Sequence, residues 1–349
     1  MTKFWTDTVT RLTPYVPGEQ RTGREVIKLN TNENPYPPSP RVIEAISQVD
    51  GHALRKYPDP ESVNLRKTLA DYHGIGVENV FVGNGSDEIL ALAFLAYFTH
   101  GDVLQYPDIT YSFYPVYCDL YSIAAKTVAL EKDYSLSLDS FVPNAGSIIF
   151  PNPNAPTAMA VSLDSIGQLL DQHTEHVMLV DEAYADFGAQ SAIALIDRYP
   201  NLLVSHTFSK GRSMAGVRLG AAFGDASLIE GLQRVKNSFN SYPVDVLAQT
   251  AGVASLLDES YYRKTINTII ETREWTVNEL RLRGFQVLPS SANFVFAKVP
   301  DADASQLFEK LNRASVLVRY WHKPRLEEWL RISIGTPDDM RTLMACLDA

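Results

Sequence analysis

The chain has 349 residues, of which 45% are hydrophobic and 21% charged, so it has the composition of a soluble globular protein with one large domain or two unequal ones. The net charge of −10 argues against a nucleic-acid surface, which needs clustered lysine and arginine. No apolar run is long enough for a membrane span or a signal peptide, and the two cysteines, Cys118 and Cys346, lie far apart without metal spacing, so we expect a cytoplasmic protein without disulfides or metal.

Residues 1–28 contain several prolines and glycines and few apolar runs, which predicts an N-terminal arm in which Tyr15 either packs or reaches a site. Three asparagines and three prolines within residues 29–38 then forbid regular structure. The side chain of Asn34 in this loop either lines a binding site or belongs to a plain surface turn. Ser39 and the proline after it begin an amphipathic helix that extends to about residue 47.

A strand at residues 79–82 is followed by an apolar helix at about 89–98, and the junction between them is polar and contains glycine. Gly85 lets the backbone approach a ligand closely, and the free N–H groups at Ser86 and Asp87 favour an anion. The pattern is neither a dinucleotide fingerprint nor a P-loop, so it indicates a phosphate cup without a nucleotide. The alternative is that Ser86 and Asp87 simply cap the helix.

The next strands are predicted at about residues 102–106, 124–130 and 147–150. Tyr111 lies just beyond the first of them, where an aromatic ring either stacks on a planar ligand or joins a core cluster of tyrosines. Asn154 follows the third strand, so its side-chain amide lies on the side where open α/β sheets bind ligands.

The fully apolar segment 177–180 predicts a buried strand that ends directly at Asp181. A carboxylate there is suited to holding a pyridinium nitrogen in its protonated state, and Tyr184 faces the same way if the turn is helical. The alternatives for Asp181 are a cap or a metal ligand, and the neighbouring histidines offer no convincing metal set.

Residues 202–204 predict another buried strand, and Lys210 follows in a loop of small residues. A partly desolvated lysine beyond a strand end is a nucleophilic amine that can form a Schiff base with a carbonyl. Ser209 and Arg218 on either side of it suit a phosphate. The alternative is a surface loop with ordinary basic residues.

The remaining chain predicts a strand at 220–224 and three helices, followed by a smaller α+β unit in which Arg319 and Arg331 each lie on a strand. The three helices are expected at about 228–237, 244–257 and 261–283, and the short strands at 285–288, 293–299, 316–319 and 330–334. Alternating strands and helices from about 79 to 223 predict an α/β fold with a doubly wound, mostly parallel sheet. We therefore expect an arm at 1–28, part of a small domain at 29–50, a large domain at 51–256 and the rest of the small domain at 257–349.

The candidate site residues of the large sheet all follow the ends of predicted strands. Together they predict a binding site for a phosphorylated aromatic aldehyde. They supply a phosphate cup, a stacking ring, an acid for a ring nitrogen, a phenol for a ring oxygen and an amine for the aldehyde. Pyridoxal 5′-phosphate (PLP) has these five features.

The chain resembles the fold-type I PLP-dependent aminotransferases, and within them the histidinol-phosphate aminotransferases, over nearly its whole length. The motifs that carry the resemblance are LNTNENP at 29–35, YPDP at 57–60, GSDE at 85–88, NPNAPT at 152–157, DEAY at 181–184, TFSK at 207–210 and RISIGT at 331–336.

The resemblance implies that Lys210 forms the Schiff base with PLP and moves the proton, that Asp181 pairs with the ring nitrogen, and that Tyr184 donates to the ring hydroxyl. It implies further cofactor contacts from Tyr57 of a second subunit, Gly85, Ser86, Asp87, Tyr111, Ser209 and Arg218, and hence a homodimer with shared sites. The implied substrate contacts are Tyr15, Asn34, Arg319 and Arg331. Ala155 stands where many relatives have asparagine, so the nearest amide to the ring hydroxyl is that of Asn154.

The resemblance implies reversible transfer of an amino group between L-histidinol phosphate and 2-oxoglutarate. An aromatic aminotransferase and a threonine-phosphate decarboxylase are alternatives on the same scaffold. A non-catalytic PLP-binding protein is the alternative from another class, and the intact lysine and acid argue against it.

Overall fold

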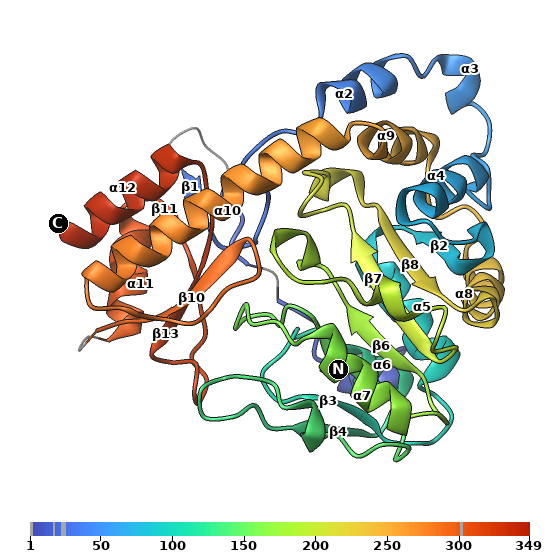
Figure 1. The fold of residues 1–349 in the computed structure, drawn as a ribbon, viewed down its shortest axis with the longest axis horizontal. Coiled ribbons are helices and arrows are strands. Elements are labelled where there is room, and N and C mark those ends of the chain that lie inside the picture. The colour runs from blue at the N-terminus through green and yellow to red at the C-terminus, as the bar shows by residue number, and fades with distance from the viewer. Residues whose placement is uncertain (1–2, 17, 22–25, 301–302) are drawn as a thin grey trace.

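A computed structural model describes residues 3–16, 18–21, 26–300 and 303–349 of the chain. Its strands form two main sheets, each with its own helices, and a two-stranded parallel pair of β1 (Ile27–Lys28) with β11 (Val316–Leu317) (Figure 1). The parts of the expected arm at residues 1–2, 17 and 22–25 lie outside the described residues. Within the described part, no helix combines the length and apolar character needed to cross a bilayer.

The large sheet has seven strands in the order β2-β8-β7-β6-β5-β3-β4. Its strands are β2 (Val80–Gly83), β3 (Leu104–Pro107), β4 (Ala125–Val128), β5 (Ile148–Pro151), β6 (Met178–Asp181), β7 (Leu202–Thr207) and β8 (Gly220–Gly224). Strand β8 is antiparallel to both of its neighbours, and the other pairs are parallel. The predicted doubly wound, mostly parallel α/β sheet is therefore confirmed.

Helices cover both faces of the large sheet, which explains why its strands are apolar at consecutive positions. On β6 and β7, Leu179 and Leu203 pack into one hydrophobic cluster, while Met178 and Val204 pack into the other. The first cluster includes residues of α5 (Gly85–Tyr97), α6 (Tyr114–Tyr121) and α8 (Ala226–Phe239). The second includes residues of α2 (Pro40–Ser47), α4 (Val63–His73), α7 (Leu163–Gln172) and α9 (Val246–Leu256).

The small sheet is antiparallel, in the order β12-β13-β10-β9. Its strands are β9 (Gln286–Val287), β10 (Phe294–Lys298), β12 (Arg319–Tyr320) and β13 (Trp329–Ser333), and its helices are α10 (Glu259–Leu282), α11 (Ala304–Arg313) and α12 (Pro337–Asp348). Figure 1 shows α10 (orange) running from α9, beside the large sheet, to α11 and α12, beside the small one.

Most predicted elements appear within a few residues of their expected bounds, and the differences have local causes. Helix α5 begins at Gly85 instead of about residue 89. Its first turn is polar and contains Asp87 and Glu88, whose negative charges are favourable at a helix N-terminus. The single strand expected at 316–319 is two strands, since the chain leaves β1 at Leu317 and joins β13 from Arg319.

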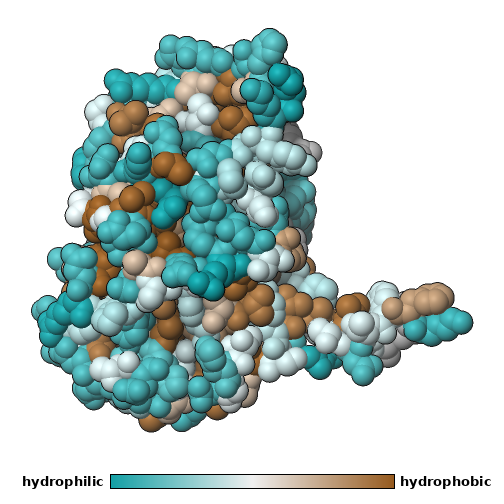
Figure 2. Space-filling view, turned by 90° about the vertical axis from the view of Figure 1, so that its right-hand side faces the viewer, coloured by the Kyte–Doolittle hydropathy of each residue, from teal (hydrophilic) through white to brown (hydrophobic). Residues whose placement is uncertain are grey.

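In the described part of the N-terminal segment there is one short helix, α1 (Asp7–Arg11), none of whose residues is buried. Further along it, Tyr15 stacks on Phe113 with ring centroids 4.5 Å apart. Figure 2 shows hydrophobic and hydrophilic side chains interleaved over one face of the molecule, with a narrow extension leaving the body at one edge.

Candidate active site

A cavity of about 770 Å³ lies where strands β3, β5, β6 and β7 end, between the large sheet and strands β12 and β13 of the small one. Its volume is typical of a small-ligand site. Its lining includes most of the residues predicted from the sequence: Tyr15, Ser86, Asp87, Tyr111, Asp181, Tyr184, Ser209, Lys210, Arg218, Arg319 and Arg331. The fold therefore brings together side chains from segments far apart in the sequence.

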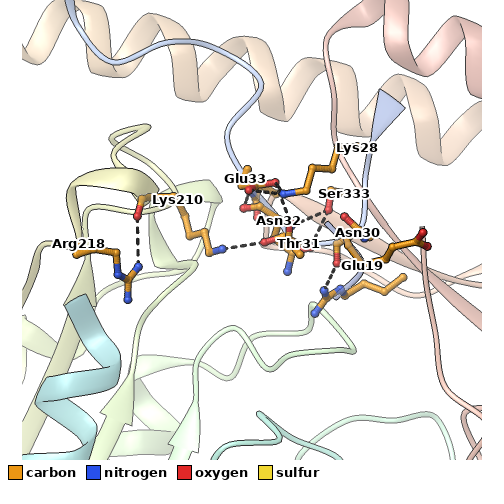
Figure 3. Close-up of polar contacts among 12 residues, drawn as sticks. Glu19, Lys28, Asn30, Thr31, Asn32, Glu33, Lys210, Arg218 and Ser333 are labelled. Atoms are coloured by element: carbon orange, nitrogen blue, oxygen red, sulfur yellow. Dashed lines mark hydrogen bonds and ion pairs between the residues drawn. The ribbon is translucent and has the colours of Figure 1, made fainter. Parts of the chain in front are cut away.

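Lys210 lies in the loop after β7 and reaches across the cavity to the segment that follows β1. Its Nζ donates a hydrogen bond to the backbone carbonyl of Thr31 at 2.9 Å (Figure 3). Burial, reinforced by the positive charge of Arg331, lowers the pKa of the Lys210 amine to about 8. A nucleophilic, neutral amine is therefore available near neutral pH.

Asp181 is the last residue of β6, and it is 4% exposed. Its carboxylate accepts hydrogen bonds from the hydroxyl groups of Tyr114 at 3.1 Å and Ser205 at 3.2 Å, and from the backbone N–H of Ala183 at 3.3 Å. Burial raises the pKa of this carboxyl to about 6. A cationic group in the cavity would favour its ionised form.

Two tyrosines line the cavity with their hydroxyl groups held at fixed places. The hydroxyl oxygen of Tyr184 accepts a hydrogen bond from Nδ2 of Asn32 at 3.0 Å, and burial raises its pKa. The hydroxyl of Tyr111 donates to Oδ1 of Asp87 at 2.9 Å, and burial together with that carboxylate raises its pKa well above the ordinary value.

The first turn of α5 provides backbone N–H groups that no side chain of the preceding residue caps. Gly85 has a φ of +77°, and a Cβ atom there would lie 2.7 Å from a guanidinium nitrogen of Arg218. Arg218 itself pairs with Asp87 at 3.1 Å. A helix N-terminus beside an arginine is a suitable site for a phosphate group.

The opposite end of the cavity is formed by Arg319 and Arg331. In Arg331, Nη2 donates to the backbone carbonyl of Asn30 at 2.8 Å, while Nε is buried without a partner. Among the described residues, the side chain of Arg319 makes no hydrogen bond or ion pair. Both guanidinium groups lie over the ring of Trp321, at 5.5 and 5.3 Å from its centroid. The unpartnered Nε of Arg331 can donate a hydrogen bond to a bound ligand. The two neighbouring guanidinium groups favour a ligand that is an anion.

Four predicted contacts lie outside the cavity lining, and one of them, Gly85, begins the first turn of α5 described above. The side chain of Asn154 is buried and donates to the carbonyl of Ile109 at 3.0 Å, and that of Asn34 donates to the carbonyl of Lys210 at 3.0 Å. Asn34 thus holds the backbone of the lysine loop. Tyr57 is 81% exposed and stacks on Tyr242, so it lies outside the cavity of its own chain.

Sequence reasoning missed the contributions of Asn32 and Trp321. Asn32 has a left-handed φ of 56°, and its amide contacts Tyr184 from behind the cavity wall. The density of asparagines in its loop was the available signal, but the loop has no periodicity that shows which amide points where. Trp321 lies close to both arginines in the segment after β12.

The described part of the chain contains no group of three or more histidine, cysteine, aspartate or glutamate side chains that could hold a metal ion.

Comparison with known proteins supports an aminotransferase fold. Residues 24–347 match the family model of class I and II aminotransferases. A solved histidinol-phosphate aminotransferase of Sinorhizobium meliloti, in complex with pyridoxal-5′-phosphate, superposes with a TM-score of 0.89 at 24% identity, covering 99% of this chain and 97% of that one. An L-threonine-O-3-phosphate decarboxylase of Porphyromonas gingivalis shares the fold with a TM-score of 0.76 at 20% identity, covering 93% of this chain and 98% of that one.

Curated relatives are similar over their full length. The histidinol-phosphate aminotransferase 1 of Burkholderia pseudomallei is 51% identical over 99% of this chain and 98% of its own length. The histidinol-phosphate aminotransferase of Chromohalobacter salexigens is 50% identical over 100% of this chain and 99% of its own length. The chain therefore belongs to the family of class I and II aminotransferases, in the branch that contains the histidinol-phosphate aminotransferases.

Proposed function

We propose that this protein is a PLP-dependent histidinol-phosphate aminotransferase of histidine biosynthesis. It would move an amino group between L-histidinol phosphate and 2-oxoglutarate, giving imidazole-acetol phosphate and glutamate. The observation that carries the proposal is one cavity with Lys210 and Asp181 at the large sheet and the cations Arg319 and Arg331 at the small sheet. Within the described residues, the buried Nε of Arg331 has no hydrogen-bond partner. Curated histidinol-phosphate aminotransferases that are about 50% identical to this chain over nearly its full length support the proposal.

The residues of the cavity fit PLP by their chemistry. The uncapped first turn of α5 offers N–H donors for a phosphate, and buried Asp181 has a raised pKa that a cationic ring nitrogen would lower. The amine of Lys210 is buried and partly neutral. When bound, PLP supplies an aldehyde that captures amines and a ring that takes up electrons from the substrate.

The side chains around the cavity then have distinct roles. Lys210 would hold the aldehyde carbon in the resting enzyme and later move a proton at the Cα of the substrate. Asp181, held by Tyr114 and Ser205, would keep the ring nitrogen protonated. Tyr184 would donate to the ring oxygen, and Tyr111 would stack on the ring.

The cofactor phosphate would be held by the backbone of Gly85, Ser86 and Asp87, together with Ser209 and Arg218. Asn154 remains a predicted cofactor contact, although its Nδ2 is occupied by the carbonyl of Ile109.

The substrate phosphate would bind Arg319 and Arg331. Arg331 would serve both substrates in turn, because a guanidinium can donate two parallel hydrogen bonds to a phosphate in one half-reaction and to a carboxylate in the other. Tyr15 lines this end of the cavity and Asn34 supports the lysine loop, so both are retained as substrate-site residues.

A homodimer with shared sites is part of the proposal. Tyr57 is exposed in its own chain, as expected for a residue that completes the phosphate site of a partner subunit. Other large apolar side chains are exposed as well, among them Phe239 and Leu257. The domain division into 1–28, 29–50, 51–256 and 257–349 is likewise proposed, and it agrees with separate hydrophobic clusters at the two sheets. A cytoplasmic location agrees with two unpaired cysteines.

The test is a steady-state assay of the purified enzyme, loaded with PLP, with L-histidinol phosphate and 2-oxoglutarate. We expect glutamate to form in step with imidazole-acetol phosphate, and the Lys210→Ala variant to form none. Absence of glutamate from the wild-type reaction would contradict the proposal.

Two parallel assays separate the rivals on the same scaffold. Release of carbon dioxide from threonine phosphate would indicate a decarboxylase, whose fold this chain shares. A higher kcat/KM with phenylalanine or tyrosine than with histidinol phosphate would indicate an aromatic aminotransferase.

A further inference from the structure

Asn32 lies in the loop between β1 and α2 and has an unusual backbone conformation. Its φ is 56°, in the left-handed region, and its side chain is buried with 1% exposure. A buried residue other than glycine keeps this conformation when its surroundings over-determine it, and such residues gather at functional sites. The surroundings of Asn32 therefore require an explanation.

Each polar group of Asn32 has a partner. The backbone N–H donates to Oγ of Ser333 at 2.9 Å, and the backbone carbonyl accepts from Nδ2 of Asn293 at 3.0 Å. In the side chain, Oδ1 accepts from the hydroxyl of Ser333 at 2.8 Å, and Nδ2 donates to the hydroxyl oxygen of Tyr184 at 3.0 Å. Figure 3 shows Asn32 beside Ser333, next to Thr31, whose carbonyl accepts from Lys210.

This network fixes the orientation of the side-chain amide. Ser333 accepts the backbone N–H of Asn32, so its own single hydroxyl proton is free to go to Oδ1. The reverse orientation would leave the buried hydroxyl proton of Ser333 without an acceptor among the described residues, so Oδ1 faces Ser333 and Nδ2 faces Tyr184. The phenol oxygen of Tyr184 is consequently an acceptor toward Asn32.

The phenol proton of Tyr184 is left for the cavity. Among the described residues, no acceptor for this proton is present, since Asn32 provides the one hydrogen bond that this hydroxyl makes. Tyr184 lines the cavity, whereas Asn32 lies behind it. Thr31, the residue before Asn32, accepts the hydrogen bond from the amine of Lys210 with its carbonyl.

We infer that Asn32 is a positioning residue that acts through Tyr184: by donating to the phenol oxygen it turns the phenol proton into the cavity, toward the ring oxygen of the cofactor. The inference rests on the proposed function for the identity of that cofactor as PLP.

The test compares two variants that keep the backbone conformation. Asn32→Asp retains the shape and tolerates a left-handed φ, but its carboxylate accepts the phenol proton instead of donating. Asn32→Gly tolerates the same φ and removes the hydrogen bond. A third variant, Ser333→Ala, keeps Asn32 itself but removes the hydroxyl that bonds both its backbone N–H and Oδ1, which frees the amide to rotate.

The readout is the pH at which the absorbance band of the bound cofactor titrates in the resting enzyme, without substrate. Loss of a donor to the ring oxygen makes the deprotonated cofactor less stable, so this pH should rise. We expect a rise of about one to two pH units for Asn32→Asp and a smaller rise in the same direction for Asn32→Gly and Ser333→Ala.

Asn144 offers a control away from the cavity, because it is also left-handed, with a φ of 57°, and both ends of its side-chain amide are hydrogen-bonded, to the backbone of Thr174 and Gln172. Asn144→Gly and Asn144→Asp should lower the melting temperature and leave the cofactor titration at the wild-type pH. If the Asn32 variants also lose stability without moving the titration, the residue is merely structural and the inference is overturned. The titration needs no substrate, so its failure is distinguishable from a failure to use histidinol phosphate.

Discussion

Arg319 and Arg331 are directly paired across the antiparallel strands β12 and β13, although both side chains are positively charged. Like charges directly opposite one another in a sheet destabilise it by roughly 0.2–1 kcal/mol. The ring of Trp321 lies within 5.5 Å of both guanidinium carbons, and an aromatic face offsets part of this repulsion. An anionic substrate would offset the rest.

The first prediction follows from this pair. Arg319→Gln should raise the free energy of unfolding of the substrate-free enzyme by roughly 0.2–1 kcal/mol, because it removes the repulsion. It should also lower kcat/KM for histidinol phosphate roughly 10- to 100-fold, because a charge-assisted hydrogen bond is lost. Urea unfolding and steady-state kinetics measure the two effects, and Arg313→Gln, on the exposed surface of α11, is the control. A variant that lost both stability and activity would contradict this account.

The second prediction concerns Asp181 in the enzyme freed of PLP. Its folded pKa is about 6 and the ordinary value is 3.8, so the folded state binds more protons between these pH values. Stability therefore falls as pH rises through this window. Asp181→Asn has no such group, so its stability relative to the wild type should increase by about 2 kcal/mol between pH 4 and pH 7. Denaturant unfolding at both pH values checks this, and a constant difference would contradict it.

The third prediction concerns the amine of Lys210, whose pKa is lowered to about 8. The rate at which the cofactor-free enzyme captures PLP should rise about tenfold per pH unit well below pH 8 and level off above it, because the neutral amine is the nucleophile. Stopped-flow absorbance measures this rate. Lys210→Arg keeps a cation but has no nucleophilic amine, so borohydride reduction and mass spectrometry should find no cofactor attached to it.

The fourth prediction uses the close packing of β8 against the start of α5. A Cβ atom at Gly220 would lie 2.7 Å from backbone atoms of Gly85 and Ser86, whereas one at Gly216 would meet nothing within 4 Å. Gly220→Ala must therefore displace the turn that is proposed to hold the cofactor phosphate. We expect its affinity for PLP to fall roughly tenfold or more and that of Gly216→Ala to stay near the wild-type value. Equilibrium dialysis against PLP distinguishes the two.

The fifth prediction concerns the ion pair of His206 and Glu182, at 2.7 Å, on β7 and just after β6. Burial opposes the charged imidazole, but the hydrogen bond and charge of Glu182 outweigh it and raise the pKa of His206. The ion pair therefore stabilises the folded state fully below about pH 6.5. This stabilisation is lost as the pH rises through the pKa of His206 in the folded protein.

His206→Gln should cost about 3–5 kcal/mol at pH 6 and less at pH 9, as measured by urea unfolding. The more exposed pair of His176 and Asp102, at 3.6 Å, is the control, and His176→Gln should cost less than about 1 kcal/mol. An equal cost of His206→Gln at both pH values would contradict the expected direction.

The sequence made the large sheet and the strand-end residues predictable for a physical reason. Parallel strands end at one edge, so Asp181 and Lys210 were expected near each other once their strands were identified, and both line the cavity. Side chains in irregular loops follow no period, so the sequence does not reveal that the amides of Asn34 and Asn154 bond backbone carbonyls. The left-handed conformation of Asn32 likewise leaves no pattern in the sequence.

The proposed cofactor contacts Asp181, Ser209 and Lys210 lie at the ends of large-sheet strands, whereas the arginines proposed for the substrate lie on two short strands of the small sheet. With these proposed roles, the reaction chemistry and the choice of substrate would depend on separate segments of the chain. Replacing the hairpin of β12 and β13 would consequently change the substrate specificity of the enzyme. A grafted hairpin with other charges would alter which amines bind, while the residues at the ends of the large-sheet strands stay unchanged.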